Sequence, residues 1–153
     1  IMKKSVMILM LTGLLWACSS NASSDGGAVA DPEDPAHGHE TALTLNNGQK
    51  WNADAATGEN VTAIHVLAGN FAAEPHTGLS DYGVLASDLQ KGLDRMIQEC
   101  KMSGPDHDAL HLWLEPLLRD VNELKKADDP VSAQKIMHAI NERLDLYTQY
   151  FEQ

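Results

Sequence analysis

The chain of 153 residues is poor in cysteine, in aromatic residues and in positive charge. Its two cysteines, Cys18 and Cys100, are too few for a disulfide scaffold. Eleven Lys and Arg stand against 22 Asp and Glu, a formal net charge of −11. Nucleic-acid binding needs a basic surface that neutralises phosphates, so this balance argues against it. Aromatic residues make up only 5% of the chain, and Ala, Leu, Asp and Glu dominate, which favours helices over a β-sandwich or barrel.

Sequence motifs of known enzyme classes are also lacking. The chain has no nucleophile elbow, no phosphate-binding loop and no pair of carboxylates in a credible context. It has no Cys-x-x-Cys-His motif, which excludes a covalently attached c-type haem. We therefore expect a protein that is not an enzyme.

The N-terminal segment has the pattern of an export signal. Lys3 and Lys4 precede an apolar run of about a dozen residues that ends before Cys18, as in a secretory signal peptide. A membrane span needs about 20 apolar residues, so the alternative of an uncleaved anchor is less favoured. The stretch Leu15-Trp16-Ala17-Cys18 resembles the bacterial lipobox, in which the cysteine is lipidated and becomes the new N-terminus. We predict a lipoprotein signal peptide over residues 1–17 and lipidation at Cys18.

The residues after Cys18 predict a tether. Residues 18–42 hold Ser, Asn, Asp, Gly, Pro and Ala with almost no large apolar side chain, which is typical of a flexible linker. Ser19 rather than Asp follows the cysteine, and this resembles an outer-membrane address. The chain is thus expected on the periplasmic side of the outer membrane, with the lipid as its only membrane contact.

The remaining residues, 43–153, predict an all-α domain. Leu43-Thr44-Leu45 and the turn signal Asn46-Asn47-Gly48 indicate a short extended arm that Trp51 anchors. Ser80, Asp106 and Asp129 are predicted helix N-caps. Apolar residues then recur with helical spacing in four stretches, Val61–Phe71, Leu85–Cys100, Leu110–Leu124 and Ala133–Phe151. Four amphipathic helices with short loops predict an up-down-up-down four-helix bundle, preceded by the tether and the arm.

The turn between the second and third predicted helices gathers side chains that bind metals. Cys100, Met102, His107 and His111 fall within 12 residues, and the two histidines are spaced i, i+4 on one helix face. Thiolate and thioether ligands select copper(I), while imidazole serves copper or zinc. Structural zinc sites rarely use Met, so zinc is the less favoured ion. We predict a copper site; the alternative is that these residues only pack in the core.

Four other histidines are expected to have no ligand role. His65 falls on the flank of the first helix and His138 on the solvent side of the fourth. His37 and His39 lie in the tether, where a polar linker is the simpler interpretation.

Two motifs of the chain resemble those of a known family. Leu43-Thr44-Leu45-Asn46-Asn47-Gly48-Gln49-Lys50-Trp51 and Cys100-x-Met102-x-Gly104-x-x-His107-x-x-Leu110-His111 resemble a largely uncharacterised family of small bacterial secreted or lipid-anchored proteins. That family is associated with heavy-metal-handling genes. The likeness covers about residues 43–126 and implies a helical domain exposed to the periplasm. It supports metal binding but names no reaction.

Two functions from different classes follow. The first is copper sequestration or delivery to a metal-efflux partner through the four clustered side chains, with electron transfer if the copper changes oxidation state. The second is a structural module without metal, in which the acidic bundle presents a helix face to another envelope protein.

Overall fold

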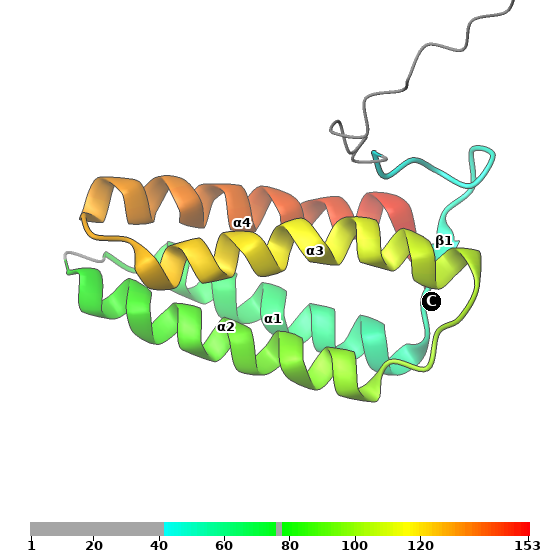
Figure 1. The fold of residues 1–153 in the computed structure, drawn as a ribbon, viewed down its shortest axis with the longest axis horizontal. Helices are drawn as coiled ribbons and strands as arrows, with labels where there is room; N and C mark the ends of the chain where they lie inside the picture. The colour runs from blue at the N-terminus through cyan, green and yellow to red at the C-terminus, as the bar shows by residue number, and fades with distance from the viewer. Residues whose placement is uncertain (1–41, 76–77) are drawn as a thin grey trace, which may run out of the picture. The chain divides into compact units, whose positions relative to one another are not determined.

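Four helices pack side by side around one apolar core (Figure 1). The computed structural model describes residues 42–75 and 78–153, which belong to one compact unit, His39–Gln153. The helices are α1 (Ala55–Ala73), α2 (Leu79–Glu99), α3 (Pro105–Lys126) and α4 (Pro130–Tyr150). This confirms the predicted all-α four-helix bundle. The predicted signal peptide, Cys18, His37 and His39 lie outside the described residues.

The core consists of the apolar faces that the helical spacing predicted. Met96, Leu93 and Leu89 of α2 are fully buried, and so are Leu117 of α3 and Leu144 of α4. At one end of the bundle, the aromatic ring of Trp113 in α3 meets that of Tyr147 in α4 edge to face, with ring centroids 5.0 Å apart. The indole N–H of Trp113 donates to the backbone oxygen of Arg143 at 2.8 Å, so this buried nitrogen is satisfied.

Helices α1 and α2 approach closely because α2 has a glycine at the crossing. A Cβ atom on Gly92 would lie 2.8 Å from Cγ1 of Ile64, closer than real Cβ contacts. Ile64, which is 2% exposed, therefore fills the space that the missing side chain leaves. The side chain of Ile64 in α1 thus packs directly against the backbone of α2.

The helix starts agree with the predictions at one of three caps. Asp129 caps α4 as predicted, since its Oδ1 accepts from the amides of Val131 and Ser132 and Pro130 takes the first helical position. The prediction of Ser80 as a cap is wrong: α2 begins at Leu79, and Gly78 is in the cap position without a side-chain bond. Leu79 packs against the core, and the helix therefore begins one residue before Ser80.

The predicted cap of α3 is also wrong. The helix begins at Pro105, because proline suits the first helical position, and Gly104 is in the cap position with φ +68°. Asp106 lies inside the first turn, and its Oδ1 instead accepts from the backbone N–H of Asn52 at 3.0 Å.

The predicted arm is present and is held by hydrogen bonds along its length. Asn46 and Gln49 bond reciprocally through their backbones around Asn47 (φ +53°) and Gly48 (φ +86°), a left-handed turn. The indole N–H of Trp51 donates to the Thr44 backbone oxygen at 2.7 Å. The arm then forms β1 (Trp51–Asn52), which pairs in parallel with β2 (Phe151–Glu152). This pairing was not predicted: Phe151 was assigned to the fourth helix, which ends at Tyr150.

Candidate metal site at the turn between α2 and α3

The turn that carries the predicted ligands is fixed by backbone hydrogen bonds. The N–H of Cys100 donates to the Met96 backbone oxygen at 2.9 Å and ends α2. The next amide, Lys101 N–H, donates to Asp54 Oδ2 at 2.6 Å, while Asp54 Oδ1 accepts from Thr57 N–H at 2.7 Å. Asp54 thus caps α1 and holds the turn with the same carboxylate.

The electrostatics of Asp54 follow from these bonds. Burial opposes ionisation, but the hydrogen bonds from Thr57 and Lys101 outweigh burial, so the pKa of Asp54 lies below its usual value. Asp54 is therefore ionised at neutral pH and remains a strong acceptor. Its role was not predicted from the sequence, although its position before an apolar helical stretch is the ordinary signal of an N-cap.

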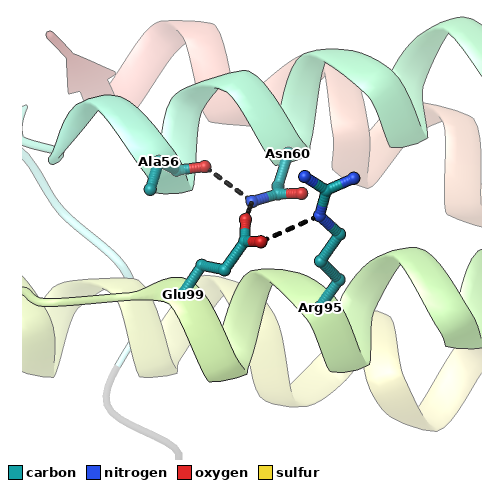
Figure 2. Close-up of polar contacts among 4 residues, drawn as sticks. All are labelled: Ala56, Asn60, Arg95 and Glu99. Atoms are coloured by element: carbon teal, nitrogen blue, oxygen red, sulfur yellow. Dashed lines mark hydrogen bonds and ion pairs between the residues drawn. The ribbon is translucent and has the colours of Figure 1, made fainter.

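A second polar network fixes the end of α2 against α1 (Figure 2). The Nδ2 group of buried Asn60 donates to Ala56 O at 2.8 Å and to Glu99 Oε2 at 2.7 Å. Arg95 Nε donates to the other oxygen, Glu99 Oε1, at 3.0 Å. The bond from Asn60, followed by that from Arg95, lowers the pKa of Glu99. The residue directly before Cys100 is thus held by partners on both helices.

His107 and His111 are brought together by the first two turns of α3. Their ring centroids are 4.7 Å apart, with an interplanar angle of 55°. His107 is half-buried, and the side chain of His111 is 52% exposed. His111 Nδ1 lies 3.6 Å from Glu115 Oε1, one turn further along the helix. That separation is too long for a hydrogen bond but within the range of an ion pair.

Cys100 and Met102 lie on the side of the turn that faces the core. Both side chains are half-buried and pack against the apolar cluster. Cys100 also interacts electrostatically with Tyr147, whose pKa is raised to about 12 by burial first and then by Asp54 and Cys100. Within residues 42–75 and 78–153, no group of three or more His, Cys, Asp or Glu side chains is arranged to hold a metal ion. The Cys100 thiol therefore does not form such a group with the two imidazoles.

Tyr147 is a second residue that the sequence did not connect with this turn. Its ring stacks on Phe151 at 4.9 Å and meets Trp113 edge to face. Its hydroxyl is buried and has no hydrogen-bond partner in the part of the chain that the structure describes. The spacing along α4 marks it only as a core residue, so no sequence signal reveals an unsatisfied hydroxyl.

The remaining described histidines stand apart from this pair. His65, on the flank of α1 as predicted, pairs with Asp145 of α4 at 2.9 Å. His138 is exposed, as predicted, and lies 3.4 Å from Glu142. Each therefore has a carboxylate neighbour, and the only close pair of imidazoles that the structure records is His107 with His111 among the described residues.

The helices of the described region are too short or too polar to cross a membrane. Comparison with known proteins yields nothing further: no family model, curated protein or solved structure matches the chain.

Proposed function

We propose that the protein is a lipid-anchored periplasmic protein that binds copper, and that His107 and His111 are its first two ligands. The observation that carries this proposal is the pair of imidazoles 4.7 Å apart on one face of α3. Two histidines at i and i+4 on a helix present their nitrogens to one ion, as in helical zinc motifs. Imidazole binds copper as well as zinc, so the pair alone admits both ions.

Cys100 and Met102 are the donors that select copper in this proposal. They precede His107 by a short loop, and thiolate and thioether both favour copper(I). Their side chains face the core, so binding requires the loop to turn them toward the imidazoles. Gly104, with φ +68°, lies between the two pairs of donors in a conformation that glycine adopts readily.

The exposure of the site favours transfer over storage. The His111 side chain is 52% exposed, so an ion held there is open to exchange with a partner. The net charge of −11 attracts cations to the surface without selecting among them. Delivery to a metal-efflux protein, or sequestration before delivery, is the activity that follows.

The proposal is tested by a titration with copper(I) against a chromophoric competitor, in reduced and anaerobic buffer. The protein runs from residue 18 onward with Cys18→Ser and so contains the whole compact unit. We expect one equivalent bound, with weaker binding of zinc in a parallel titration. His107→Ala and His111→Ala each remove a ligand. Loss of a residue that only supports a ligand weakens metal binding by roughly 10–100-fold, so we expect each of these two variants to lose more copper affinity than that.

The matched control is His138→Ala. His138 lies one helix turn from Glu142, as His111 does from Glu115, but among the described residues no second imidazole is recorded beside it. If His107 and His111 form the site, His138→Ala leaves the copper affinity unchanged. Cys100→Ser and Met102→Leu test the soft donors, because they reduce the preference for copper over zinc. Equal binding by the parent and all five variants would contradict the assignment of the site, and absence of copper binding by the parent would favour the interaction module without metal.

A further inference from the structure

A groove runs along the seam between α1 and α4, on a side of the bundle that the proposed copper site does not use. Its volume is about 680 Å³, which lies within the range of small-molecule sites. Apolar side chains from both helices and from β2 line it, including Val61, Val66, Leu144 and Phe151. It spans α1 from Gly58 to Gly69, about 16 Å of helix at 1.5 Å per residue.

The groove is open at Gly69, where α1 has no side chain to fill it. A Cβ atom on Gly69 would meet nothing within 4 Å. Val66, one turn earlier, is 56% exposed. An elongated apolar ligand laid along this seam would cover Val66 and remove its surface from water.

The charges at the groove differ from those of the chain as a whole. Although the chain has 22 acidic residues against 11 basic ones, the described lining includes Lys50 and His65 and no acidic side chain. His65 is already paired with Asp145 at the rim. Lys50 Nζ donates to the backbone oxygen of Thr148 at 2.6 Å, which fixes the ammonium beside the groove. An ammonium has three N–H donors, so this bond leaves donors for a ligand.

An apolar groove with an ammonium beside it suits a ligand that has an apolar chain and an anionic head. We propose that the α1–α4 groove binds a fatty acid, with its chain along Val61, Val66 and Leu144 and its carboxylate on Lys50. A carboxylate is repelled by most of this acidic surface, so Lys50 determines the direction in which the chain lies. The inference is independent of the copper proposal, because it involves neither α3 nor its histidines.

The test is calorimetric titration of the Cys18→Ser protein, from residue 18 onward, with laurate below its micelle concentration. We expect one saturable site. Shorter saturated acids should bind more weakly, by about fourfold for each methylene removed. Gly69→Phe fills the groove and should weaken laurate binding at least tenfold. The matched control is Gly83→Phe on α2, where a Cβ atom also meets nothing within 4 Å but which does not line the groove.

The position of the carboxylate is tested by Lys50→Met with two ligands of equal chain length. Laurate should bind about tenfold more weakly to this variant, because a charge-assisted bond is lost, while dodecanol should bind equally to both proteins. A thermal melt checks that each variant is folded. Absence of saturable binding, equal loss in Gly69→Phe and Gly83→Phe, or no effect of Lys50→Met on laurate would overturn the proposal. A dimer that Gly69→Phe abolishes would also overturn it and assign the groove to a second copy.

Discussion

Tyr147 carries a hydroxyl that folding removes from water without a hydrogen-bond partner among the described residues. Its ring contributes contacts with Trp113 and Phe151 that do not depend on this hydroxyl. We expect Tyr147→Phe to keep those contacts and to raise the free energy of unfolding by about 1–2 kcal/mol, the cost of an unsatisfied buried group. Urea denaturation measures the change. A loss of stability would show that the hydroxyl has a partner in solution.

Asp54 gives the fold a dependence on pH. Its pKa is lowered in the folded state, so the unfolded chain binds more protons between the two pKa values. The stability from Asp54 is therefore fully present above its unfolded pKa and is lost as the pH falls through the folded pKa. Glu99 and Asp129 have lowered pKa values and act in the same direction.

The variant Asp54→Asn isolates this residue from the other carboxylates. Asparagine caps a helix about as well as aspartate but does not titrate in this range. Free energies of unfolding from urea titrations between pH 3 and 7 should fall less steeply toward acid in Asp54→Asn than in the parent. Identical slopes would show that Asp54 does not contribute to the acid sensitivity.

The packing of α1 on α2 depends on Gly92. Alanine favours a helix over glycine by about 1 kcal/mol, yet the new Cβ atom would lie 2.8 Å from Ile64 Cγ1. We expect the steric cost to exceed the gain, so Gly92→Ala lowers the free energy of unfolding by about 1–2 kcal/mol. Gly83→Ala is the control, because its Cβ atom meets nothing within 4 Å and the helix gain should appear alone. Thermal melts of the two variants should shift in opposite directions.

Among the elements, the helices could be predicted and some of their ends could not. Periodic apolar residues such as Leu89, Leu93 and Met96 identify a buried face from the sequence alone. Helix ends depend on contacts that are distant in sequence. Asp106 has the composition of a cap, but it bonds to Asn52, 54 residues away, and Pro105 starts the helix instead. Two-residue strands such as β1 and β2 leave no periodic pattern at all.

The same limit applies to the candidate site. The i, i+4 spacing predicted that His107 and His111 share a face, because that relation is local to one helix. Whether Cys100 joins them depends on which way the turn faces, and this is decided by Asp54 and by core packing. Neither partner is visible from the spacing of the motif. Local chemistry is thus predictable here, and the convergence of side chains across a loop is not.

At the scale of the whole molecule, the excess of negative charge opposes folding. Within the described residues, 42–75 and 78–153, folding brings 17 acidic and 9 basic residues into a compact volume, which increases their net repulsion. Salt shortens the screening length from about 30 Å at 0.01 M to about 8 Å at 0.15 M. We therefore expect the urea midpoint of the protein to rise with sodium chloride over this range. A midpoint that falls would show that attractive pairs such as Arg143–Asp120 outweigh the repulsion.

The parallel pairing of Trp51 with Phe151 also fixes an order of events during synthesis. The amide of Ala53 bonds to the Glu152 oxygen at 2.7 Å, so the arm finds its partner only after residue 152 has been made. Until then the ribosome holds a chain in which the arm before α1 has no strand to pair with. The loop that the β1–β2 pair closes is about 100 residues long. The entropy lost on closing this loop has to be compensated by contacts that have already formed. The β1–β2 pair therefore forms only after all four helices have been synthesised.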